Sequence, residues 1–226
     1  MMNLTWSLLT TLLLGLMLLL PACNSMRRDP DISAAERAAQ TLLRQGKYQE
    51  SFDAFLELRK AYPNSYIPLQ GLARCSAMLG KSDLFEFYAM EASSQAPSTP
   101  TAHGRLGALY VAAAERFRLN PFSRQYAEMG CLYLSQALAA DRNTPQAPYN
   151  LGVGFYLLGR DAEAINVLQD VLRRQPGRLE AIQVLLSVYR RGDKPDEARE
   201  LLKPLVKENR VPPEWKAVYD WAFAGS

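Results

Sequence analysis

The chain has 226 residues, of which 48% are hydrophobic, and it carries 26 basic against 23 acidic side chains. This length suits one domain with a sizeable core, or a solenoid of about five to six short repeats. Because the charges are scattered, no clustered basic face points to a nucleic-acid partner. The three cysteines, Cys23, Cys75 and Cys131, are far apart in the sequence and make no metal-binding or redox motif.

The beginning of the chain is uncharged and strongly apolar. Residues 1–26 contain no charged side chain, and Leu8–Leu20 consists of Leu, Thr, Gly and Met alone. Such a run has the length of the apolar region of a secretion signal and is short for a membrane-spanning helix. It ends in Leu20-Pro21-Ala22-Cys23, which resembles the lipobox of bacterial lipoprotein signal peptides. The resemblance implies that residues 1–22 are cleaved off and that Cys23 is acylated, palmitate included, which gives stable membrane anchoring.

One feature departs from this signal pattern, because residues 1–7 contain no Lys or Arg. The alternative is an uncleaved anchor that spans roughly Leu4 to Pro21 and holds Arg27 and Arg28 in the cytoplasm. On the lipoprotein interpretation, Asn24 after the cysteine implies delivery to the periplasmic face of the outer membrane. Residues 24–31 then form a linker that reaches at most ~25–30 Å, so the remaining chain works close to the membrane.

The stretch Pro145–Arg210 contains the same pattern twice. Four residues are each followed, 34 positions later, by an identical or chemically similar residue: Leu151 by Leu185, Phe155 by Tyr189, Ala164 by Ala198 and Leu168 by Leu202. This period and pattern strongly resemble the tetratricopeptide repeat. The resemblance implies an all-α fold, in which helix–turn–helix hairpins stack into a right-handed superhelical solenoid. Gly152 would let the two helices of a hairpin approach closely, and Gly159 and Gly192 would allow the turns.

Extending the pattern in both directions divides the chain into five repeats. Their expected bounds are 32–65, 66–99, 100–144, 145–178 and 179–212, followed by a capping helix and tail at 213–226. The sequence Ser33-Ala34-Ala35-Glu36 favours a capping box at the start of the first helix. In the second repeat, Phe85 replaces a small residue and Ser76 a large one, which predicts a repacked core of conserved volume. The cap would use Trp215, Val218, Tyr219 and Ala222 to cover the last open face.

The third repeat is longer than the others by 11 residues. We expect its first helix to run on through Arg118 and Asn120-Pro121 to break the chain before a second long helix. Insertions often mark a binding face, so Phe117, Phe122 and Tyr126 are candidates for docking a partner. The alternative is that these aromatic side chains pack against one another within the hairpin. In the fifth repeat, Pro204 should kink its helix or end it early.

No residue pattern points to catalysis. His103 is the single histidine and has no Cys or carboxylate at ligand spacing, and no phosphate-binding loop, HExxH or GxSxG motif occurs. Cys75 and Cys131 most simply behave as small buried apolar residues rather than as a disulfide. We therefore expect no enzyme, no metal site, no cofactor and no small-molecule substrate.

The resemblance places a partner-binding groove on the concave side, lined by the first helix of each repeat. Carried over to this sequence, that face presents nine residues: Gln70, Arg74, Met78, Tyr149, Val153, Tyr156, Gln183, Ser187 and Arg190. Tyr149, Val153 and Tyr156 form one helical stripe. The stripe would either offer aromatic anchors to a peptide or belong partly to the core between repeats.

These features predict a membrane-anchored scaffold that binds a protein or peptide partner in the bacterial envelope. Lipoproteins of similar architecture serve type IV pilus secretin assembly, outer-membrane protein insertion or regulation of peptidoglycan hydrolases, and the sequence does not choose among them. The alternative is a single-span adaptor of the same fold that faces the cytoplasm.

Overall fold

The computed structural model describes residues 30–224, which form eleven α-helices and one 3-10 helix. The predicted all-α fold is therefore confirmed for this part of the chain. The helices follow one another as hairpins: α2 (Pro30–Arg44) with α3 (Tyr48–Ala61), α4 (Tyr66–Met78) with α5 (Ser82–Gln95), α6 (Pro100–Arg116) with α7 (Ser123–Ala140), α8 (Ala147–Leu157) with α9 (Asp161–Arg174), and α10 (Leu179–Arg191) with α11 (Pro195–Lys207). The 3-10 helix η1 (Pro213–Trp215) and α12 (Lys216–Phe223) follow.

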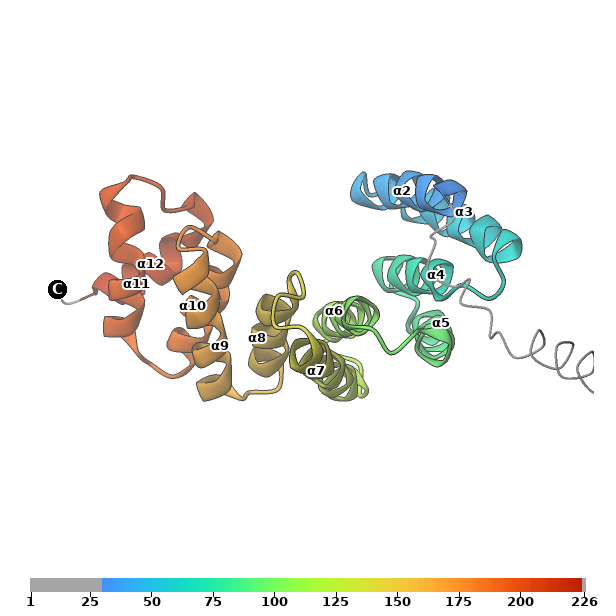
Figure 1. Ribbon diagram of the computed structural model, residues 1–226. Helices are drawn as coiled ribbons and strands as arrows, with labels where there is room; N and C mark the ends of the chain where they lie inside the picture. The colour runs from blue at the N-terminus through green and yellow to red at the C-terminus, as the bar shows by residue number, and fades with distance from the viewer. Residues whose placement is uncertain (1–29, 225–226) are drawn as a thin grey trace, which may run out of the picture.

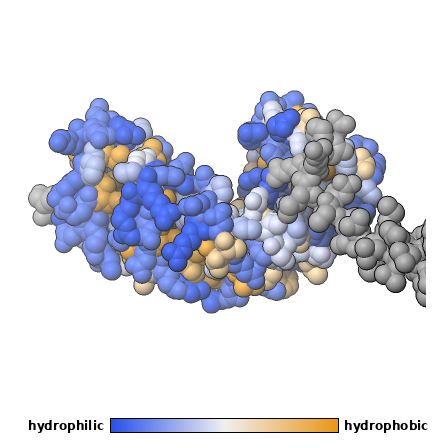
Figure 2. Space-filling view, in the orientation of Figure 1, coloured by the Kyte–Doolittle hydropathy of each residue, from blue (hydrophilic) through white to orange (hydrophobic). Residues whose placement is uncertain are grey.

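The hairpins stack into a solenoid that bends into an open U (Figure 1). Each first helix contacts the first helix of the next hairpin, in the order α2, α4, α6, α8 and α10. Helices α2 and α3 form one arm, α10 to α12 form the other, and α6 and α8 lie at the floor of the bend. The space-filling view is hollowed between the two arms (Figure 2). The first helices therefore line the inner side, as the resemblance implied.

In the fourth and fifth hairpins the repeated residues form the core. Ala164, Ala198, Leu168 and Leu202 are completely buried. A Cβ atom at Gly152 would lie 2.6 Å from Cγ of Leu168. Only a residue without a side chain therefore lets α8 and α9 approach as closely as predicted.

The third hairpin is the longest, with 17 residues in α6 and 18 in α7. Helix α6 ends at Arg116, two residues before the predicted Arg118. The aromatic residues divide between the two alternatives. Phe117 and Tyr126 pack against Phe85, with ring centroids 5.8 Å and 5.1 Å away, whereas Phe122 remains 51% exposed.

The second repeat has the repacked core that its sequence indicated. Phe85 and Ser76 are both completely buried. The Ser76 hydroxyl donates a 2.8 Å hydrogen bond to the carbonyl of Leu72, which satisfies this polar group inside the core. Phe85 in turn fills the space between α5 and the third hairpin.

Two local predictions were wrong, those for Ser33 and Gly192, and a third, for Pro204, was only partly tested. Helix α2 already begins at Pro30, so Ser33 lies inside it and is not its N-cap. Helix α11 continues past Pro204 to Lys207, so it does not end at the proline, and the kink stays a prediction. The left-handed turn residue after α10 is Asp193, with φ 51°, while Gly192 has φ −88°. Gly159 does adopt the left-handed conformation, with φ 74°.

The C-terminal segment covers the last hairpin. Trp215 and Ala222 are buried in the core formed by α9, α10 and α11, and Val218 and Tyr219 pack against its edge. The segment thus buries an apolar face that a terminal hairpin would otherwise expose. Between residues 30 and 224, no helix is long and apolar enough to cross a membrane.

Candidate functional site

A pocket of about 190 Å³ opens on the inner side of the solenoid, where three successive first helices meet. Its polar lining comes from α2 with Glu36 and Gln40, from α4 with Gln70 and Arg74, and from α6 with Arg105. Apolar side chains, Leu43, Phe55, Ile67 and Leu109, complete the walls. We call this the inner pocket.

The acidic group of the inner pocket is already neutralised. Glu36 is only 6% exposed, and its Oε1 accepts hydrogen bonds from Arg105 Nη1 at 3.2 Å and Gln40 Nε2 at 2.7 Å. A buried carboxylate needs such partners because it has lost its hydration. Glu36 therefore shapes the pocket without giving it a free negative charge.

Two donors of the inner pocket remain unused. Gln70 Nε2 is buried and has no hydrogen-bond partner in the part of the chain that the structure describes. Arg74 is exposed and makes no ion pair with residues 30–224. Desolvation lowers the pKa of the Arg74 guanidinium, although arginine stays protonated in proteins. The pocket thus combines an exposed cation with an unpaired amide buried in its lining, beside apolar walls.

The predicted stripe on α8 is largely covered by the next repeat. Val153 is 7% exposed and belongs to the core. The guanidinium of Arg178 lies 4.1 Å from the ring centroid of Tyr149, and that of Arg191 lies 4.6 Å from the ring of Tyr156. Burial raises the pKa of Tyr149. One face of each tyrosine ring is therefore occupied by a cation–π contact.

The nine predicted groove residues do not form one continuous site. Gln70 and Arg74 share the inner pocket, Tyr149 lines a groove beside α7 and α9, and Tyr156 lines a separate hollow with Arg191. Val153 is buried on α8, and the remaining four residues lie along α4 and α10: Met78 and Ser187 are half-buried, and Gln183 and Arg190 are exposed.

Sequence reasoning missed three residues of the inner pocket, Glu36, Gln40 and Arg105. Glu36 was assigned to a capping box, whereas its carboxylate faces Arg105, 69 residues away. No local pattern reveals a pair at that separation. One signal could have indicated the pair. Glu36 lies on the inner face of the first helix, at a position that the repeat would bury, and a buried Glu needs a partner.

The remaining candidate groups show no reactive arrangement within residues 30–224. His103 is half-buried, with its ring 5.7 Å from the ring of Tyr133. The described residues contain no cluster of His, Cys, Asp or Glu that could hold a metal ion. Cys75 and Cys131 are buried free thiols, and burial raises the pKa of both. Cys23, the predicted lipidation site, lies outside the described residues.

Comparison with known proteins gives the following matches. Residues 34–65 and 155–221 each match a family model described as tetratricopeptide repeat. No curated protein matches the sequence.

Several solved structures share the fold at low sequence identity. A thermophilic tetratricopeptide-repeat protein of Thermus thermophilus is 19% identical, with a TM-score of 0.64 over 84% of this chain and 98% of the other. PilW, described as a widely conserved type IV pilus biogenesis factor, is 18% identical, with a TM-score of 0.68 over 86% and 91%. A repeat protein of Parabacteroides merdae is 14% identical, with a TM-score of 0.60 over 88% and 71%. At these identities the likeness concerns the fold.

Proposed function

Because the chain belongs to the tetratricopeptide-repeat family, we propose that it is a scaffold that holds a protein partner on its inner side while a lipid on Cys23 keeps it at the membrane. Repeat solenoids of this kind offer extended concave surfaces to other proteins. The observation that carries the proposal is the pair of unused donors in the inner pocket, Gln70 Nε2 and the Arg74 guanidinium.

The inner pocket suits an extended stretch of a partner protein. After a change of rotamer that turns its Nε2 into the pocket, Gln70 can donate to a backbone carbonyl, and Arg74 can donate to a carbonyl or a carboxylate as it stands. A volume of about 190 Å³ between Leu43, Phe55 and Ile67 accommodates an apolar side chain of the same stretch. Binding would satisfy Gln70, which otherwise carries the cost of a buried donor without a partner.

The proposed place of action is the periplasmic face of the outer membrane. Its support is the sequence Leu20-Pro21-Ala22-Cys23-Asn24, with a short linker between Cys23 and α2. PilW, which shares the fold, is described as a pilus biogenesis factor. Type IV pilus assembly is therefore the first envelope process to test, ahead of outer-membrane protein insertion and regulation of peptidoglycan hydrolases.

Crosslinking in native membranes tests the partner. Gln70→Ala combined with Arg74→Ala should reduce recovery of the proteins that crosslink to the wild type, as measured by quantitative mass spectrometry. Arg37→Ala, an exposed change on α2 outside the pocket, is the matched control and should leave recovery unchanged. Equal recovery by the double variant and the control would remove the inner pocket from the proposal.

Mass spectrometry of the purified native protein tests the anchor. We expect a chain that begins at an acylated Cys23, and we expect Cys23→Ser to release the protein from the membrane. A chain that still carries residues 1–22 with an unmodified cysteine would contradict the lipoprotein. Inactivity of a periplasm-dependent reporter fused to the C-terminus would then favour the cytoplasm-facing adaptor.

A further inference from the structure

A second and larger concavity lies between the second helices α7 and α9. It has a volume of about 720 Å³ and is bounded by the ends of α7 and α9, the connection 142–146 and the first turns of α8. We call it the α7–α9 groove. We propose that this groove binds an acidic segment of a partner protein that also carries apolar side chains.

The position of the groove separates it from the inner pocket. Helices α7 and α9 lie on the outer side of the bend, whereas α6 and α8 face inward (Figure 1). The lining of the groove shares no residue with the lining of the inner pocket. A partner could therefore occupy the α7–α9 groove while another occupies the inner side.

The groove has an apolar floor. Leu151 and Val171 are buried, and Leu138 and Val167 are half-buried along its length. Figure 2 shows hydrophobic surface beside strongly hydrophilic surface over α8 and α9. A volume of this size exceeds what one side chain fills and is comparable to ligand sites of about 300–1,000 Å³. Several consecutive side chains of a partner fit such a floor.

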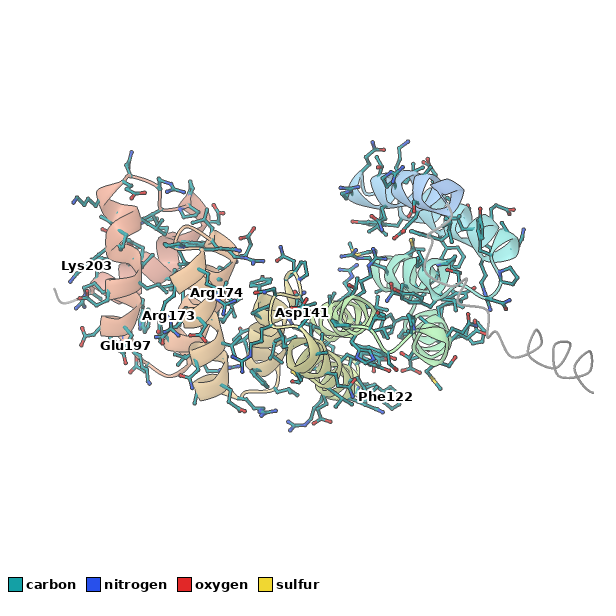
Figure 3. All side chains as sticks on the ribbon, in the orientation of Figure 1. Phe122, Asp141, Arg173, Arg174, Glu197 and Lys203 are labelled. Atoms are coloured by element: carbon teal, nitrogen blue, oxygen red, sulfur yellow. The ribbon has the colours of Figure 1, made fainter. Side chains whose placement is uncertain are left out.

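The walls of the groove carry an excess of positive charge. Arg142 stands on the α7 side and Arg174 on α9, and both are exposed. In the described part of the chain neither forms an ion pair or a hydrogen bond through its guanidinium. Figure 3 labels Arg174 at the end of α9 and Asp141, the neighbour of Arg142, at the end of α7. Free cations thus stand on both sides of the apolar floor.

The other charges near the groove are already compensated. Asp170, the acidic residue of the lining, pairs with Arg173 on the same helix. Arg178 covers the ring of Tyr149, donates to Gln146 Oε1 and pairs with Glu180 at 3.9 Å. Within the lining this leaves two guanidinium groups without an ion-pair partner among residues 30–224, those of Arg142 and Arg174, while the Asp141 carboxylate beside the lining accepts the Asn143 backbone N–H. The lining itself is therefore net positive, which electrostatic complementarity matches to acidic side chains.

The chemistry of the groove favours a peptide over other anions. Apolar floor and cationic walls lie side by side, so the ligand must present apolar and acidic groups within a few residues of each other. The amide side chains of Asn143 and Gln175, also in the lining, can hydrogen-bond a peptide backbone. A lipid headgroup would use the cations, but a peptide backbone also supplies N–H donors and C=O acceptors at regular spacing for both amides.

Selection from a display library of random octapeptides, with the full chain purified from membranes in mild detergent as the bait, tests the proposal. Peptides that combine Asp or Glu with Leu, Ile or Phe should be enriched. Fluorescence anisotropy then measures the affinity for a selected peptide, and the combined Arg142→Ala and Arg174→Ala changes should lower that affinity about tenfold. Asp170→Asn should tighten it about twofold, because Arg173 then adds its charge to the groove.

The matched control is Arg37→Ala with Lys207→Ala, which removes the same charge from exposed positions on α2 and α11 and should leave the affinity within about twofold. Arg74→Ala, which alters the inner pocket, should also leave the affinity for the selected peptide unchanged. A negative result for the α7–α9 groove is therefore distinguishable from a negative result for the inner pocket. Enrichment of peptides without acidic residues, or equal binding by the groove variant and the control, would overturn the proposal. The proposal would also be overturned if the Arg142→Ala, Arg174→Ala variant lost binding to phosphatidylglycerol vesicles but still bound the selected peptide. Both arginines are exposed, and circular dichroism checks that the variants fold.

Discussion

Arg105 Nη1 lies 3.2 Å from Glu36 Oε1, and this ion pair joins α6 to α2 across the intervening α4. In a repeat solenoid each unit mainly contacts its neighbours, and here α2 contacts α4 and α4 contacts α6. The pair therefore links the first and third repeats directly. It also fixes the distance between two walls of the inner pocket, so stability and partner binding depend on the same contact.

Replacing Arg105 by Ala should leave a buried carboxylate without its cation. We expect the free energy of unfolding in urea to fall by about 1–3 kcal/mol. In the background of Glu36→Gln, which removes the negative charge, the same Arg105→Ala change should cost less than about 1 kcal/mol. If Arg105→Ala lowered the free energy of unfolding equally in the two backgrounds, the double-mutant cycle would show that the ion pair contributes nothing to stability.

Helices α6 and α7 pack tightly at Gly107. A Cβ atom there would lie 2.5 Å from Leu134 Cγ and 2.9 Å from the carbonyl oxygen of Gly130. In an open helix Gly→Ala would stabilise by about 1 kcal/mol, but here we expect Gly107→Ala to destabilise by about 1–3 kcal/mol. Thermal unfolding measures the sign. Gly177→Ala, whose nearest neighbouring atom would be 4.0 Å away, is the control, and a raised Tm for Gly107→Ala would refute the packing argument.

The fold was predictable because the repeating residues are those that every hairpin must bury. Ala164 and Ala198 lie where helices cross, and Leu168 and Leu202 fill the space beside them, so chemistry and position recur together at 34 residues. The extra length of the third hairpin followed from the same counting. Turn geometry was harder, since Gly192 and Asp193 are adjacent and either could take the left-handed position.

The inner pocket was only partly predictable. Gln70 and Arg74 followed from the phase of the repeat, which says which side of a first helix faces inward. Glu36 and Arg105 did not, because their contact depends on how sharply the solenoid bends over three repeats, and no sequence period encodes that curvature. The α7–α9 groove was missed for the same reason.

Burial raises the pKa of the Cys131 thiol to about 11 from an ordinary value of 9.0. Below pH 9 the thiol is neutral in both states, so its contribution is fully present there. As the pH rises towards 11 the unfolded thiol ionises first, and the free energy of unfolding should fall by about 2–3 kcal/mol. Because other buried groups also titrate in this range, the measurement compares urea unfolding of the wild type with Cys131→Ala. The wild type should lose more stability than the variant, and parallel curves would contradict the assignment.

Trp215 is 6% exposed and packs into the core of the last hairpins, together with Leu205 and Ala222. Trp215→Ala should remove about 3–5 kcal/mol of local stability. Because coupling in a solenoid passes from neighbour to neighbour, the loss should be largest in α10 and α11 and small in α4. Hydrogen exchange measured by mass spectrometry resolves these helices. Tyr219→Ala, a partly buried position on the same segment, should have a weaker effect of the same pattern. Equal loss of protection in α4 and α11 would mean that the solenoid unfolds as one unit and that the segment is not a local cap.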